Sequence, residues 1–287
     1  MKNKKICVLG SGTMGHGIAQ VCAQAGYQVN LWDIKDELVE SGISRIRKFL
    51  SSSVERRKMT QDEADPTLSR IKGTTDLEEA AEDVDLVIEA VVEDIDIKKD
   101  LFRKLDQICP DHTIFASNTS SLSVTEMAMV TKRPDRFTGM HWFNPPQLMR
   151  GIEVVRTERT SPETLEAMVS LCKELGKEPG ICKDSTGFIV NRLLQIWYNE
   201  SLNMFDEGIA EPQDIDTALK EAYNFRMGPF ELRDMVGLDV ALAVGEAHYQ
   251  GFMREQFKPP RCLVMKVKAG DLGRKTGRGF YEYETKA

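Results

Sequence analysis

Short runs of apolar residues alternate with amphipathic segments through the N-terminal part of the chain. The run at residues 5–9 ends at a glycine, small and helix-tolerant residues fill Met14–Ala25, and a second apolar run covers residues 29–33. Buried parallel strands give continuous apolar runs of this kind, and Gly26 is typical of a residue that ends a helix. We therefore predict a strand–helix–strand unit in this segment.

The same alternation continues to about residue 183. Further strands are predicted at 86–90, 113–117, 137–143 and 152–155, and further helices at 96–108, 124–129 and 161–176. A long polar segment, 37–70, precedes the third strand and carries apolar residues at helical spacing. It predicts a helical hairpin that is broken near Thr60 and Pro66.

No strand pattern follows residue 183. Helices are predicted at 188–207, 213–222, 228–248 and 259–269. Strands that alternate with helices favour a mostly parallel sheet. We therefore predict an α/β chain, with a mostly parallel sheet in residues 1–183 and a second, smaller, all-α domain in residues 184–287.

A glycine-rich turn, Gly10-Ser-Gly-Thr-Met-Gly15, joins the first predicted strand to the first helix. The Gly-x-Gly-x-x-Gly pattern is weak alone, but between a strand and a helix it is typical of a dinucleotide-binding Rossmann domain. The N-terminus of the helix then offers N–H donors to a pyrophosphate. We predict cofactor contacts at Gly10, Gly12, Thr13, Met14 and Gly15.

Asp33 closes the second predicted strand. Its carboxylate can accept hydrogen bonds from the adenosine ribose and would repel a 2′-phosphate, so NAD is favoured over NADP. The nearby Lys35 weakens that preference. A turn that binds no dinucleotide and an FAD site are the alternative interpretations.

His141 and Glu153 lie in two apolar strands on either side of the rigid turn 144–146. A carboxylate between Ile152 and Val154 is costly to bury unless it is paired, and folding the strands over the turn would bring it to the imidazole. The other ring nitrogen could then move a proton. A strand histidine is often structural, but beside a hydride carrier we interpret the pair as the acid–base group of a dehydrogenase without a metal.

Composition excludes several other functions. The 287 residues carry a net charge of −7, which argues against nucleic acid or an anionic membrane as a partner. No apolar run has the length of a membrane span or of a signal-peptide core, so we expect a cytoplasmic protein. The six cysteines form no Cys-x-x-Cys pair, so neither disulfides nor a metal site is expected.

Motifs along essentially the whole chain resemble those of the short-chain L-3-hydroxyacyl-CoA dehydrogenases, and most nearly their bacterial 3-hydroxybutyryl-CoA branch. The matching stretches are 10–20, 92–94, 116–122, 141–146, 184–192, 227–232 and 273–281. The resemblance implies NAD as cofactor, an acyl-CoA substrate and a homodimer formed through the C-terminal domain. Apolar helix faces in that domain agree with an interface. Their residues are Phe188, Leu193, Ile196, Trp197, Leu238, Val240 and Leu242.

The resemblance also implies roles for individual residues. His141 would be the general acid/base and Glu153 its orienting partner, while Ser120 and Asn191 would bind the substrate near its 3-oxygen. The implied cofactor contacts are Glu93, Lys98, Asn118, Ser120, Asn144 and Lys275. Arg56 would contact a CoA phosphate, and the basic side chains around it support that interpretation, with a solvated helix surface as the alternative. These side chains are Arg45, Arg47, Lys48, Arg57 and Lys58.

Some of these positions have a second interpretation from the residues alone. Ser120 belongs to the polar run 117–121, which either lies at a ligand-binding strand end or supplies the N-cap of the helix at 124–129. Asn191 is also typical of a solvated helix residue. Two alternative functions remain open. One is another NAD-linked hydroxyacid or sugar-acid dehydrogenase of the gulonate type, and the other is a non-catalytic NAD-binding protein.

Overall fold

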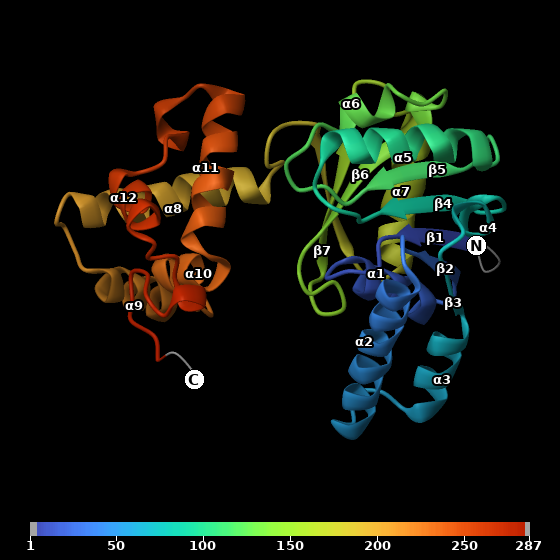
Figure 1. Ribbon diagram of the computed structural model, residues 1–287, viewed down its shortest axis with the longest axis horizontal. Coiled ribbons are helices and arrows are strands. Elements are labelled where there is room, and N and C mark those ends of the chain that lie inside the picture. The colour runs from blue at the N-terminus through green and yellow to red at the C-terminus, as the bar shows by residue number, and fades with distance from the viewer. Residues whose placement is uncertain (1–4, 285–287) are drawn as a thin grey trace. The chain divides into compact units, whose positions relative to one another are not determined.

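The structure, a computed structural model, describes residues 5–284. The chain divides into two units at residue 188, Met1–Phe188 and Ile189–Ala287 (Figure 1). Among the described residues, no helix is both long and apolar enough to cross a membrane.

One eight-stranded sheet forms the centre of the first unit, with the strand order β3-β2-β1-β4-β5-β6-β7-β8. Its strands are β1 (Lys5–Leu9), β2 (Gln28–Trp32), β3 (Ile71–Thr74), β4 (Leu86–Glu89), β5 (Ile114–Ser117), β6 (Phe137–Trp142), β7 (Gly151–Arg156) and β8 (Glu178–Lys183). Neighbouring strands are parallel except β6 and β7, which pair antiparallel. The predicted fold class, a mostly parallel Rossmann-type sheet with a second, helical domain, is confirmed.

Helices cover both faces of the sheet and bury two separate apolar cores. They are α1 (Gly15–Gln24), α2 (Asp36–Glu55), α3 (Gln61–Ser69), α4 (Leu77–Ala81), α5 (Ile95–Ile108), α6 (Val124–Ala128) and α7 (Pro162–Glu174). One core contains residues of α1, α2, α3 and α7, and the other contains residues of α4, α5 and α6. Burial on both faces explains why β1 and β4 are almost continuously apolar and why every residue of β6 is buried.

The second unit is helical around its own core. Its helices are α8 (Val190–Asp206), α9 (Pro212–Tyr223), α10 (Pro229–Val236), α11 (Leu238–Phe252) and α12 (Arg261–Ala269). The rings of Phe205, Phe230 and Phe280 pack edge to face in the centre. Asp234, which is fully buried, accepts hydrogen bonds from the backbone N–H groups of Phe280 and Tyr281 and so fastens the C-terminal segment to α10.

Two predicted helical segments differ from the structure. The hairpin is broken only between α2 and α3, and Pro66 lies inside α3, because a capping box between Thr60 and Glu63 starts that helix and a proline in so short a helix removes only one hydrogen bond. The single helix predicted at 228–248 is two helices. Gly237 separates them with φ +105°, a conformation that a helix cannot contain.

Two edge strands, β3 and β8, were absent from the prediction. β3 has four residues and includes Gly73, while β8 includes Pro179 and Gly180 and is only partly buried. Proline and glycine weaken the strand signal, and an edge strand tolerates both because one of its sides needs no partner strand. The sheet therefore extends further at both ends than the apolar pattern indicates.

Lys177 is a buried cation that fastens the turn between β6 and β7. Its ammonium donates hydrogen bonds to the carbonyls of Pro146, at 2.6 Å, and Met149, at 2.7 Å, and lies 5.5 Å from the ring centre of Trp142. Burial lowers the pKa of Lys177. The turn begins with Asn144. The two hydrogen bonds of Lys177, which we call the Lys177 clamp, therefore also help to position the side chain of Asn144.

Replacing Lys177 by methionine keeps the apolar stem but leaves both carbonyls without their donor. We expect Lys177→Met to lower the free energy of unfolding by about 1–3 kcal/mol, the usual cost of buried acceptors left unsatisfied. Urea denaturation measures the change, and Lys173→Met, at an exposed site on α7, is the matched control. Equal midpoints for the two variants would contradict the proposed clamp.

Candidate active site

The carboxyl ends of β1, β4 and β5 meet at one edge of the sheet, where a glycine turn leads into α1. A Cβ on Gly10, which has φ +91°, would lie 2.5 Å from the carbonyl oxygen of Ala90, and one on Gly15 would lie 1.7 Å from that of Gly10. Neither position therefore accepts another residue. A Cβ on Gly12 would meet nothing within 4 Å, so open space lies in front of the helix N-terminus, where a pyrophosphate is expected.

Asp33 is held beside this turn by residues that sequence reasoning missed. Its Oδ2 accepts a hydrogen bond of 2.8 Å from the backbone N–H of Ser11, and the hydroxyl of Ser11 lies 2.8 Å from the same oxygen. Its Oδ1 accepts from the backbone N–H of Ile34. The carboxylate is thus oriented before any ligand arrives, as recognition of a ribose requires.

A cleft of about 580 Å³ lies next to Asp33 and is walled by apolar side chains. Ile34, Val92 and Ile97 are 68%, 63% and 49% exposed, although all three are large and apolar. Exposed apolar side chains around a cleft are typical of a binding site. These residues stand in loops and at the start of a helix, where no periodic pattern marks them.

A second cleft, of about 530 Å³, lies between the glycine turn and β6. Most of the sequence-predicted residues of the first unit come together here. They are Gly12, Thr13, Met14, Glu93, Lys98, Asn118, Ser120, His141 and Asn144. Because the glycine turn, where a pyrophosphate is expected, and His141 both line it, we call it the nicotinamide cleft.

His141 and Glu153 face each other across the antiparallel pair of β6 and β7. Nδ1 of His141 lies 2.6 Å from Oε2 of Glu153, and the residues are 6% and 3% exposed. The rings of Phe143 and Phe188 lie 4.8 and 5.6 Å from the imidazole. A carboxylate on Nδ1 selects the tautomer that leaves Nε2 as the acceptor for a substrate proton.

Glu93 and Lys98 form an ion pair in the wall of the nicotinamide cleft, with 3.1 Å between Nζ and Oε2. Burial alone would raise the pKa of Glu93, but the ammonium of Lys98 and hydrogen bonds from Thr119 and Ser120 outweigh it and lower that pKa. Lys98 is only 1% exposed and also contacts Glu89, a residue that sequence reasoning missed. The cleft therefore contains fixed charges.

Asn118 and Ser120 lie in the loop that follows β5. The side-chain oxygen of Asn118 accepts a hydrogen bond of 2.9 Å from the backbone N–H of Trp142, next to His141. The backbone N–H of Ser120 donates to Glu93. The interpretation that run 117–121 caps the next helix is wrong, because Ser123 caps α6 by accepting from the backbone N–H of Glu126.

The remaining predicted residues lie apart from this cleft or in the second unit. Arg56 follows the last residue of α2 and is exposed, as are the basic residues around it. Asn191 lies in the first turn of α8, and the ammonium of Lys275 contacts both carboxylate oxygens of Asp239. The roles of all three stay predictions.

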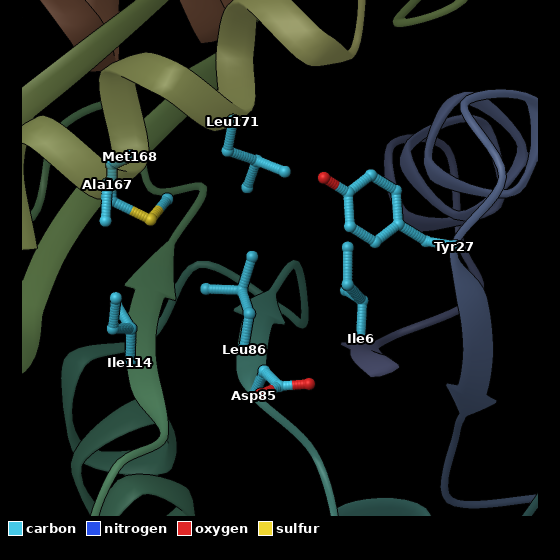
Figure 2. Close-up of a pocket in the computed structure, with 8 residues that line it drawn as sticks. All are labelled: Ile6, Tyr27, Asp85, Leu86, Ile114, Ala167, Met168 and Leu171. Atoms are coloured by element: carbon cyan, nitrogen blue, oxygen red, sulfur yellow. The ribbon is translucent and has the colours of Figure 1, made fainter. Parts of the chain in front are cut away.

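A pocket of a different kind lies at the amino ends of the strands, opposite the nicotinamide cleft (Figure 2). Ile6, Leu86 and Ile114, near the starts of β1, β4 and β5, converge there with Tyr27 and residues of α7. Its volume of about 40 Å³ holds little more than a water molecule, so this pocket is too small for a cofactor. Within residues 5–284, no group of three or more His, Cys, Asp or Glu side chains could hold a metal ion.

A Rossmann sheet with a glycine turn, an oriented carboxylate directly after β2 and a buried histidine at the cleft beside that turn defines an NAD-dependent dehydrogenase. The chain belongs to the 3-hydroxyacyl-CoA dehydrogenase family. The family's NAD binding domain matches residues 5–185 and its C-terminal domain matches residues 187–283. The predicted family and the predicted cofactor, NAD, are thereby confirmed.

Full-length relatives agree with this assignment. The probable 3-hydroxybutyryl-CoA dehydrogenase of Bacillus subtilis is 44% identical over 286 residues, which cover 100% of this chain and 99% of the relative. The mitochondrial hydroxyacyl-coenzyme A dehydrogenase of Homo sapiens is 41% identical, with 98% and 91% covered. The crystal structure of (S)-3-hydroxybutyryl-CoA dehydrogenase from Ralstonia eutropha superposes with a TM-score of 0.95 at 42% identity, and 98% and 99% of the chains are covered.

The geometry around Asp33 predicts that this residue makes the protein prefer NAD(H) to NADP(H). Asp33→Ala should weaken NADH binding about tenfold or more, because hydrogen bonds to a charged group are lost, and it should leave NADPH binding unchanged or improved. Fluorescence titration with both cofactors measures this difference. Asp36→Ala, an exposed acid three residues further on, is the control. Equal losses for NADH and NADPH would rule out the assigned role.

Proposed function

We propose that this protein interconverts (S)-3-hydroxyacyl-CoA and 3-ketoacyl-CoA with NAD, and that its main substrates are 3-hydroxybutyryl-CoA and acetoacetyl-CoA. The observation that carries the proposal is the buried His141–Glu153 pair at the nicotinamide cleft. Relatives named as 3-hydroxybutyryl-CoA dehydrogenases, at 44% and 42% identity over nearly the whole chain, support the choice of substrate.

The pair supplies the proton transfer that a metal-free alcohol oxidation needs. When bound, the nicotinamide ring accepts a hydride from C3 of the substrate or returns it. In the oxidising direction, Nε2 of His141 takes the proton of the 3-hydroxyl group, and Glu153 on Nδ1 stabilises the imidazolium that forms. In the reducing direction, the protonated His141 gives this proton to the 3-keto oxygen. The aromatic rings of Phe143 and Phe188 pack beside the imidazole and limit its movement.

Other residues are assigned supporting roles in the same proposal. Ser120 and Asn191 hydrogen-bond the substrate near its 3-oxygen, and Asn144 and Lys275 contact the cofactor. Ser120 and Asn144 line the nicotinamide cleft, which supports their part.

CoA has a strongly anionic 3′-phospho-ADP group, and α2 offers a basic surface for it. The exposed basic residues on α2 and directly after it are Arg56, Arg45, Arg47, Lys48, Arg57 and Lys58. Charge-assisted hydrogen bonds from arginine suit phosphate oxygens. A hydroxyacid dehydrogenase without a CoA site is the competing function, and a comparison of acetoacetyl-CoA with free acetoacetate as substrates separates the two.

The role of His141 is tested by replacing it with glutamine. We expect His141→Gln to bind NADH normally and to reduce kcat for acetoacetyl-CoA by about 10²–10⁴, the usual contribution of general acid–base catalysis. Steady-state NADH oxidation and a separate NADH titration measure these two quantities. His112→Gln, at an exposed histidine with 62% of its side chain accessible, should keep full activity. Near-normal turnover of His141→Gln would overturn the proposed mechanism.

We also propose that the protein is a cytoplasmic homodimer that assembles through its second unit. Leu193 and Val240 are 63% and 44% exposed in that unit, which supports an apolar interface. Two residues expected on this surface are not part of it, because Phe188 is buried in the core of the first unit and Leu238 in the core of the second.

Light scattering tests the oligomeric state. The dimer predicts twice the chain mass of 32.4 kDa across a concentration series, and Leu193→Asp should shift the protein toward the monomer because a buried charge weakens an apolar interface. Lys268→Asp, on α12, provides a matched exposed substitution. A mass of one chain at every concentration of the unmodified protein would exclude the dimer.

A further inference from the structure

Glu89, the last residue of β4, is a fully buried carboxylate that the proposed proton transfer does not use. Its Oε1 accepts hydrogen bonds from the backbone N–H of Val91, at 2.8 Å, and from Nζ of Lys98, at 2.6 Å. Its Oε2 accepts from the hydroxyl of Ser117, at 2.6 Å. Burial of a carboxylate is costly unless charge and hydrogen bonds compensate it. The three donors around Glu89 therefore indicate a site that is specifically arranged for this carboxylate.

Lys98 connects this buried carboxylate to the nicotinamide cleft. Its ammonium lies 2.6 Å from Oε1 of Glu89 and 3.1 Å from Oε2 of Glu93, and its side chain is 1% exposed. The side chain of Glu93 is 39% exposed and lines the cleft. One ammonium is therefore shared by a hidden carboxylate and an accessible one, and its position is set by both.

The charge of this cluster depends on Glu89. Glu93 and Lys98 are the only residues with a formal charge that line the described nicotinamide cleft, apart from the titratable His141, and on their own they sum to zero. The carboxylate of Glu89 behind them makes the total −1. The nicotinamide ring is a cation in NAD⁺ and neutral in NADH, and a fixed negative charge in a partly buried cleft stabilises the cation.

We propose that Glu89 is a positioning residue that fixes Lys98 and Glu93 and gives this three-residue cluster in the wall of the nicotinamide cleft a net negative charge, which favours NAD⁺ over NADH. The inference rests on the proposed function only in placing the nicotinamide ring in this cleft. Glu89, which is itself fully buried, thereby takes part in the balance between the two forms of the cofactor.

Variants of the cluster separate its charge from its packing. Glu89→Gln changes the net charge to 0, Lys98→Gln changes it to −2, and the double variant keeps −1 without any ion pair between the two positions. The dissociation constants of NAD⁺ and NADH are measured for each by calorimetric titration in the absence of substrate. We expect the ratio Kd(NAD⁺)/Kd(NADH) to rise at least about threefold in Glu89→Gln and to fall in Lys98→Gln, because the charge of a partly buried site acts on the cationic ring. In the double variant, whose net charge is unchanged, the ratio should stay within about twofold of that of the unmodified protein.

Asp106→Asn is the matched control, because Asp106 also neutralises a buried cation, Arg133, in the same unit but away from the cleft. Its ratio should equal that of the unmodified protein. A purely structural role for Glu89 would weaken the binding of both cofactor forms by the same factor and leave the ratio unchanged, and that result overturns the proposal.

Folding of each variant is checked by circular dichroism. If Glu89→Gln does not fold, Lys98→Gln carries the test alone, and an unchanged ratio in that variant is equally decisive against the proposal. Failure of the unmodified protein to reduce acetoacetyl-CoA would refute the proposed function without affecting these binding ratios, so the two outcomes are distinguishable.

Discussion

Where β7 returns antiparallel beside β6, His141 and Glu153 stand opposite each other on one rung of the ladder, and the rest of the site is arranged around that contact. Ile152 and Val154, on either side of Glu153, are buried as well. A carboxylate in such a strand is tolerated because the imidazole compensates it. A slip of one residue would turn Glu153 to the other face of the sheet, so the register of this strand pair is a requirement of the proposed proton transfer.

The turn between the two strands connects this strand pair to the nicotinamide cleft. The ammonium of Lys177 holds two of its carbonyls, and Asn144 leaves the turn on the side of the nicotinamide cleft. On the other side of the cleft, the loops after β4 and β5 are tied together by Glu89 and Glu93. Each wall is thus held by a buried charged group with several hydrogen bonds, Lys177 on one side and Glu89 on the other, as expected of a site that is preorganised for hydride and proton transfer.

Much of the fold could be predicted from the sequence because its signals are local. The buried parallel strands are continuous apolar runs, and the glycine turn needs glycine at Gly10 and Gly15 for steric reasons that hold in any Rossmann domain. The His141–Glu153 pair was predictable because an acid in an apolar strand demands a partner. The family resemblance then supplied the substrate class.

What could not be predicted depends on contacts between distant segments. In the sequence, Glu89 is a polar residue at a strand end like several others. Only the folded chain shows that Lys98 and Ser117 both donate hydrogen bonds to its carboxylate. Ser11 likewise gains its role from Asp33, 22 residues further on. The edge strands β3 and β8 and the helix break at Gly237 were not predicted, because the residues there have weak or opposite preferences for the secondary structure that they adopt.

If His141 and Glu153 act as one catalytic unit, a double-mutant cycle on single-turnover NADH oxidation by acetoacetyl-CoA will show it. His141→Gln, Glu153→Gln and the double variant are compared under identical conditions. We expect the double variant to be about as slow as His141→Gln alone, because an orienting carboxylate has no effect without the imidazole it orients. Losses that multiply in the double variant would show that the two residues act independently.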